Sequence, residues 1–174
     1  ILAIFVNLFI YSSSYAKSNA LVADLSQSDI SINTDFNGAS LLLFGSISGE
    51  IGDDIIVLIS GPSSEVVTRQ KSYISGIWVN SNSVTWKNVP SYYQIFTTKP
   101  LSQIASRDVL KSLVVGTEFL NLRYDSIEYL DTDAYNQWAD ALKRNMQSVS
   151  LWKTNETTVQ VMRGALFRTQ VSLP

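Results

Sequence analysis

Apolar and polar residues alternate in short runs over the first half of the chain, and turn-forming residues separate these runs. Leu21–Leu25 and Asp29–Ile32 alternate as half-buried strands do. Ala39–Ile47 is almost continuously apolar, which predicts a strand with both faces covered. Ile55–Ile59 is rich in β-branched residues and is followed by Gly61-Pro62, so a second buried strand is expected there.

The next runs predict a hairpin. Glu65–Tyr73 is typical of an edge strand, in which the charges of Arg69 and Lys71 face water and protect the edge from pairing with another chain. The apolar runs Ile77–Val79 and Val84–Trp86 flank the polar segment Asn80–Ser83, and this pattern predicts a tight turn at that segment. Strands at short intervals with turns between them favour an antiparallel sandwich.

Between about residues 101 and 151 the apolar positions recur every three or four residues, which predicts helices. The clearest helix begins after Asp131, a good N-cap residue, and carries Asp133 in its first turn. Its apolar positions are Tyr135, Trp138, Leu142, Met146 and Val149. The segment 159–173 then returns to a strand pattern.

These patterns predict a β-rich α+β fold. We expect an immunoglobulin-like antiparallel β-sandwich with a helical insertion at about residues 101–151 and with its C-terminal strands truncated. Residues 17–174 are expected to form this single domain.

The first sixteen residues predict export. They carry no charge, and an apolar run of about ten residues is too short to span a bilayer. Ser14 and Ala16 are small residues at the positions that signal peptidase requires. We therefore interpret residues 1–16 as a signal peptide that is cleaved before Lys17; an uncleaved N-terminal anchor is the alternative.

Composition excludes several function classes. The chain has 45% hydrophobic and 16% charged residues with a net charge of −2, and its Lys and Arg residues are scattered, so no basic stripe for nucleic acid exists. It contains neither His nor Cys. This excludes the usual zinc sites, thiol nucleophiles, disulfides and Ser-His-Asp arrangements. We expect no cofactor and no enzymatic activity.

Aromatic residues concentrate in the stretch 73–100. Trp78, Trp86, Tyr92 and Tyr93, with Phe96, could form a platform for a sugar or a peptide. Core packing of two neighbouring strands is the simpler interpretation, because large aromatic side chains supply the most burial per residue. On that interpretation Trp78, which lies mid-strand between apolar neighbours, is expected to be buried.

Two acidic segments are candidate cation sites. Asp131-Thr132-Asp133 resembles the start of a calcium loop, but Tyr135 and Asn136 stand where an oxygen ligand and a glycine are needed. Helix capping is therefore the preferred interpretation. Glu50 with Asp53 and Asp54 could hold a cation loosely, although a solvated turn is the simpler interpretation. We predict no metal site.

Three stretches carry a resemblance to a known family: 21–32 with Leu42-Leu43-Phe44-Gly45, then 76–80 continued through 89–93, and finally 164–168. Together they resemble an uncharacterised family of alphaproteobacterial transmembrane proteins. The resemblance implies a cleaved leader, an exported β-rich region with a helical insertion, and one C-terminal membrane span, which is absent from this chain. It transfers no catalytic residues, because the family has none established.

The expected function is a non-enzymatic accessory or interaction module, tethered at the periplasmic face of the inner membrane. The outward face of the predicted helix, with Lys143 and Arg144, suits an inner-membrane or envelope protein as partner. One alternative is a small-ligand or glycan-binding module that uses the aromatic stretch. A hydrolase without His or Cys is the third possibility, and no motif points to it.

Overall fold

The computed structural model describes residues 20–27, 38–48, 54–125, 129–156 and 158–174. The predicted leader at 1–16 and the predicted strand Asp29–Ile32 lie outside these residues. Within them the chain is β-rich, with ten strands and few helices. The β-rich prediction is therefore confirmed, and the arrangement of the sheets is consistent with a sandwich.

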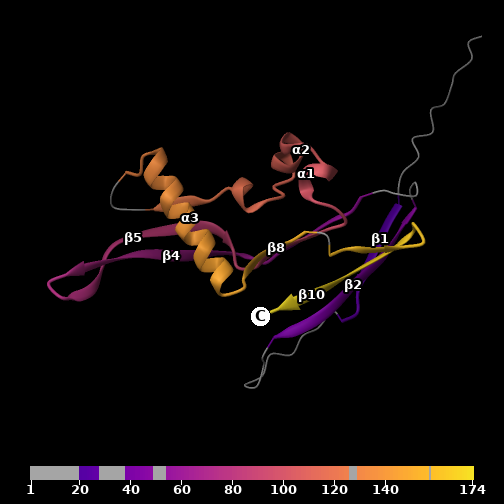
Figure 1. The fold of residues 1–174 in the computed structure, drawn as a ribbon, viewed down its shortest axis with the longest axis horizontal. Coiled ribbons are helices and arrows are strands. Elements are labelled where there is room, and N and C mark those ends of the chain that lie inside the picture. Colours follow the sequence, from indigo (N-terminus) through magenta and orange to yellow (C-terminus); the bar gives the residue numbers. More distant parts are fainter. Residues whose placement is uncertain (1–19, 28–37, 49–53, 126–128, 157) are drawn as a thin grey trace, which may run out of the picture.

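A long two-stranded ribbon runs through the middle of the molecule (Figure 1). One side of it comprises β3 (Ile56–Ser60) and β4 (Ser63–Ile74), and the other comprises β5 (Ile77–Pro90) and β6 (Tyr93–Thr97). β3 pairs with β6 and β4 pairs with β5, both antiparallel. The Gly61 amide donates to the carbonyl of Tyr92 at 2.8 Å, so pairing continues between the two halves.

The ribbon turns back at Ser75-Gly76 and not at Asn80–Ser83, so the predicted turn position was wrong. Ser75 and Gly76 have φ values of 51° and 90°. A type I′ hairpin turn requires a positive φ at both of its central residues. The polar segment instead lies inside β5. Polar residues fit that part of the strand because solvent reaches both of its faces, as the exposure of Asn80–Ser83 shows.

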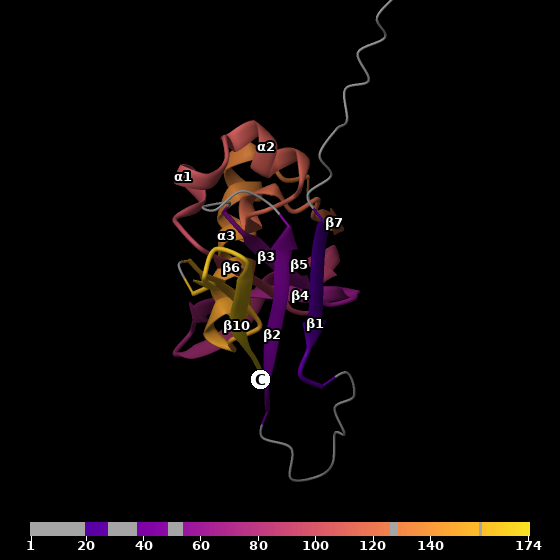
Figure 2. The same ribbon diagram turned by 90° about the vertical axis from the view of Figure 1, so that its right-hand side faces the viewer.

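A four-stranded sheet packs on the β3–β6 end of the ribbon. Its order is β1 (Ala20–Leu25), β2 (Ala39–Ser48), β10 (Leu166–Leu173) and β9 (Gln160–Met162), and Figure 2 shows β1, β2 and β10 side by side. The sheets share one apolar cluster, formed by Leu41, Ile55, Phe96, Val159, Phe167 and Val171.

The strand β2 has only one covered face. Leu41 is buried against the ribbon, whereas Leu42 and Phe44 on the other face are 40% and 43% exposed. The prediction that both faces of this strand are covered was therefore wrong. Its continuous apolar run has the same appearance as a doubly covered strand, since periodicity does not show what packs on each face.

The segment between β6 and β8 (Trp152–Asn155) contains the predicted helices. β6 and β8 are parallel neighbours, and a parallel pair needs a long crossover connection. The connection comprises α1 (Leu101–Ile104), α2 (Arg107–Ser112), a 3-10 turn (Thr117–Phe119), β7 (Arg123–Asp125) and α3 (Thr132–Ser148).

Helix α3 covers the middle of the ribbon and completes the second core. Leu142 and Met146 are buried, as the predicted apolar face requires, whereas Val149 is exposed. They join Trp86, Tyr93 and Trp152 in an apolar cluster. The remaining buried members of this cluster are Val84, Val89, Ile95, Leu110 and Val115.

Candidate functional site

Three of the four aromatic residues selected from the sequence are buried in the core. Trp86, Tyr92 and Tyr93 are 0%, 9% and 1% exposed. Trp86 packs edge-on against the rings of Tyr124 and Tyr135, with ring centroids 6.3 and 5.5 Å away. A ligand cannot reach these three residues from solvent, so they form no accessible platform with Trp78.

The polar atoms of the buried aromatic residues are mostly satisfied within the core. The Tyr93 hydroxyl donates to the Val114 carbonyl and accepts from the Gly116 amide, each at 2.9 Å. Burial raises the pKa of this phenol. The Trp152 indole N–H donates to the Pro90 carbonyl at 2.9 Å. These contacts fix a loop and a strand, which is a structural role.

Trp78 is the exception, and its predicted burial was wrong. Its side chain is 68% exposed. It lies next to the turn of the ribbon, where Tyr73, Ile74 and Ile77 are also exposed, at 62%, 53% and 63%. These four side chains are referred to below as the tip. Four large apolar side chains left in solvent at one end of a ribbon are an unusual feature for a soluble surface.

The tip is apolar on both faces of the ribbon. Tyr73 lies directly opposite Trp78, and Ile74 directly opposite Ile77. Opposed residues project to the same face and neighbours along a strand to opposite faces, so the two aromatic rings lie on one face and the two isoleucines on the other. The rings are 5.2 Å apart and inclined by 55°. The two rings are therefore not coplanar and form no flat surface.

A polar segment separates the tip from the body. The last buried pair on the ribbon is Thr68 opposite Val84, each 2% exposed. Beyond this pair, residues 69–83 form what we call the arm, which extends past α3 at the left of Figure 1. Within the arm the hydroxyls of Ser72 and Ser81 lie 2.8 Å apart across the strands. Cross-strand hydrogen bonds therefore maintain an arm that the body does not cover.

The arm is basic. Arg69 and Lys71 are exposed on β4, as the sequence predicts for a guarded edge strand. Lys71 and Tyr73 lie two residues apart on β4, beyond the register shift between Gln70 and Lys71, so alternation places them on the same face. The sequence has no acidic residue from Val66 to Arg107. The arm therefore combines two positive charges with an aromatic end.

Sequence reasoning missed three of the four tip residues. Tyr73-Ile74 and Ile77-Trp78 flank Ser75-Gly76, and a Ser-Gly dipeptide marks a turn. Two apolar pairs placed symmetrically around a two-residue turn are the pattern that could have identified the tip.

Lys143 and Arg144 lie on different sides of α3. Arg144 is exposed and lines an open groove of about 580 Å³ between α3 and β4. Lys143 is half-buried and lines a smaller pocket of about 170 Å³ beside Trp152. The groove is mostly polar, and the buried Thr68 hydroxyl at its edge has no hydrogen-bond partner within the described residues.

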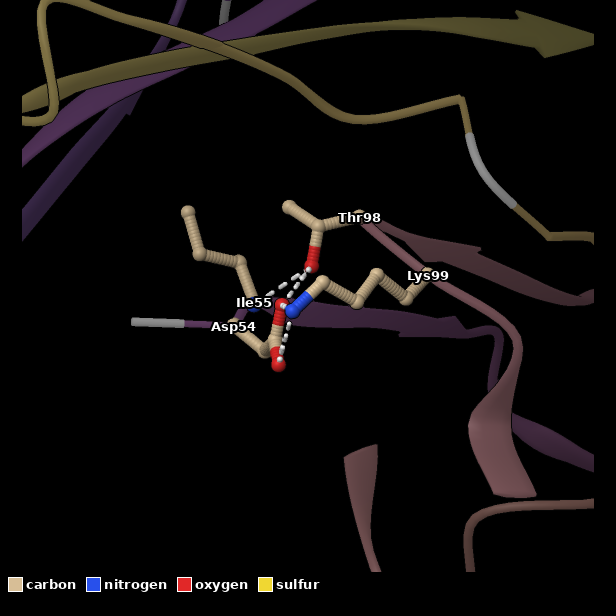
Figure 3. A network of polar contacts seen from close by, with 4 residues as sticks. All are labelled: Asp54, Ile55, Thr98 and Lys99. Carbon is tan, nitrogen blue, oxygen red and sulfur yellow. Dashed lines mark hydrogen bonds and ion pairs between the residues drawn. The ribbon is translucent and has the colours of Figure 1, made fainter. Parts of the chain in front are cut away.

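The described acidic residues of the two segments have structural roles. Asp54 accepts a hydrogen bond from the Thr98 hydroxyl and forms an ion pair with Lys99, each at 3.1 Å (Figure 3). These two contacts connect the start of β3 to the end of β6. Glu50 and Asp53 lie outside the described residues. Asp131 accepts from the Ala134 amide at 2.8 Å, which confirms its role as a helix cap.

In the part of the chain that the structure describes, no three carboxylate side chains come together in a way that could bind a metal ion. Among the same residues, no helix has both the length and the apolar character needed to cross a membrane.

Residues 20–174 match a protein family described as "Putative transmembrane protein (Alph_Pro_TM)". The chain belongs to this family. The match covers nearly the whole chain and confirms the resemblance found in the three sequence stretches. Membership associates the protein with a membrane, and the family description assigns no enzymatic activity, in agreement with a non-enzymatic protein. No curated protein and no solved structure matches the chain.

Proposed function

We propose that the protein is a non-enzymatic accessory module of the bacterial envelope and that the arm is its contact element. The observation that carries this proposal is the exposure of the tip at the end of a ribbon that leaves the body. Tyr73, Ile74, Ile77 and Trp78 contribute little to the two cores, because they belong to neither cluster. Exposed apolar patches of this kind mark interaction sites.

The proposal includes the location and the finer fold. Membrane association follows from the family, and the uncharged, mainly apolar start of residues 1–16 supports export to the periplasmic face of the inner membrane. Tethering by a C-terminal span is part of the same proposal, on the strength of the family description. The packing of a four-stranded sheet on the β3–β6 pair supports an immunoglobulin-like sandwich.

An inner-membrane or envelope protein is the proposed partner. The exposed Arg144 on α3 and Arg69 on the arm line the same groove, beside the exposed Asp140. A groove of mixed charge on the flank of a projecting arm suits a protein surface, in which charged residues at the rim select the partner.

Shortening the arm tests this function. Replacing Gln70–Asn82 by an Asn-Gly turn keeps Arg69 opposite Ser83 and removes the tip without touching either core. We expect the membrane-anchored protein to keep its melting temperature and to lose co-purification with its envelope partner. Tyr129→Ser is the matched control, because it removes an aromatic side chain that is 90% exposed outside the arm. Unchanged co-purification of the shortened protein would contradict the proposal.

The groove supports a second candidate, a small polar ligand or glycan. The observation in its favour is the polar lining of the groove, to which Thr68, Gln137 and Asn145 contribute. The 55° tilt between the rings of Tyr73 and Trp78 argues against the tip as a flat platform for a sugar. A glycan array separates the candidates: binding that Thr68→Val abolishes, and arm shortening does not, would favour the groove.

A further inference from the structure

We infer that the tip inserts into the interface of a lipid bilayer that carries anionic headgroups. This inference rests on the proposed function, in which the arm is the contact element. It adds that the end of the arm contacts lipid. It concerns the four tip residues and the two basic residues behind them.

The chemistry of the tip matches the boundary between headgroups and acyl chains. Tyr73 and Trp78 have an apolar ring with a polar group, and such side chains concentrate where one end can be dry and the other wet. Ile74 and Ile77 add apolar surface on the opposite face. A hairpin that docks in a groove of one protein needs an apolar surface on one face only. A bilayer surrounds an inserted hairpin on all sides, so both faces must be apolar.

The dimensions of the arm agree with an interfacial depth. Tyr73 and Trp78 each lie two residues from the nearer end of the turn, so at about 3.3 Å per residue the apolar part is roughly 7 Å deep. Interfacial segments typically enter the bilayer by about 5–10 Å. The polar residues Ser72 and Ser81 begin where this depth ends. Deeper insertion would bury the polar strand residues in the acyl chains, and this cost limits the depth of insertion.

The charges behind the tip complement an anionic surface. Lys71 lies about 13 Å along β4 from the turn, and Arg69 lies two residues further back. With about 7 Å of the tip inserted, Lys71 lies roughly 6 Å outside the apolar part and Arg69 roughly 13 Å outside it, so Lys71 is the nearer of the two to the lipid phosphates. No acidic residue follows in the chain until Asp108, and the Lys87–Asp125 pair at the base of the ribbon is 3.5 Å apart and already neutralised. Each basic residue near such a surface strengthens binding about five-fold.

Tryptophan fluorescence tests insertion at the tip itself. The full chain is mixed with vesicles of phosphatidylcholine, alone or with phosphatidylglycerol, that contain lipids brominated near the top of the acyl chain. Trp86 and Trp152 are 0% and 1% exposed, and residues 1–16 contain no Trp. Trp138 is half-buried in the groove between α3 and β4, on the body side of the arm. Trp78 is therefore the tryptophan that the bromines can reach. We expect quenching in the wild type and none in Trp78→Phe.

Further variants test the role of the two basic residues and control for the loss of an exposed aromatic side chain. On anionic vesicles Lys71→Gln should raise the lipid concentration for half-maximal quenching about five-fold, and Arg69→Gln should raise it by less, because the attraction falls off within a Debye length. Neither variant should change quenching on neutral vesicles. Tyr129→Ser should quench as the wild type does, because its lost ring is outside the arm.

Failure of this inference can be distinguished from failure of the proposed function. Absence of quenching in the wild type on both vesicle types overturns the bilayer contact. If arm shortening still abolishes co-purification in that case, the tip binds a protein and the proposed function stands. If arm shortening alters neither the quenching signal nor co-purification, both proposals are wrong.

Discussion

Two tryptophans on β5 allow a matched test of the division between core and arm. Trp86 is fully buried and Trp78 is 68% exposed, although the two lie eight positions apart on one strand. Replacing each by Ala removes the same atoms from different surroundings. We expect Trp86→Ala to be strongly destabilising and Trp78→Ala to be nearly neutral.

The magnitudes follow from the packing. Trp86 contacts Tyr124 and Tyr135 in the core, and truncating a buried Trp costs about 3–5 kcal/mol, a large part of a typical total stability. The Trp86 indole N–H has no partner within the described residues. Trp86→Phe removes that unpaired donor and should therefore cost clearly less than Trp86→Ala. Trp78→Ala loses only the cross-strand contact with Tyr73, about 0.2–1 kcal/mol.

Urea unfolding followed by far-UV circular dichroism measures the difference. With a slope of about 2 kcal/mol per molar urea, Trp86→Ala should lower the midpoint by roughly 1.5–2.5 M and Trp78→Ala by less than about 0.5 M. Equal midpoint shifts for the two variants would refute the separation of arm from core. A Trp78→Ala shift above about 1 M would show that the tip packs on the body.

Three further outcomes are expected. Burial raises the pKa of Tyr93 above its ordinary 10.0, so the unfolded phenol ionises first and the folded state loses stability as pH rises above about 10. In urea titrations at increasing pH, Tyr93→Phe should weaken this loss of stability. Part of the loss should remain, because burial also raises the pKa of Tyr92. Asp131→Ala should cost about 1 kcal/mol in thermal melting, because α3 loses its N-cap, whereas Asp131→Asn should preserve most of that stability. N-terminal sequencing of the mature protein should begin at Lys17, and retention of residues 1–16 would exclude cleavage.

Local chemistry in the sequence was sufficient for several features. The side chain of Asp131 caps α3 because capping needs only the residue and the first helical turn. Arg69 and Lys71 face water on β4 because charged side chains are not buried unpaired. The β-rich class follows from alternation along short runs, and family membership follows from residues spread over the whole chain.

Tertiary structure alone decided which apolar residues are covered. Trp78 and Trp86 each follow apolar or β-branched residues in the sequence, so local pattern treats them alike. They differ because Val84 and Trp86 share a core with Leu142 and Met146 of α3, whereas Trp78 belongs to neither core. Alternation determines the face to which a side chain points, but burial requires another element on that face. The length of the arm beyond α3 therefore exposes the tip, and no residue within the tip encodes this by itself.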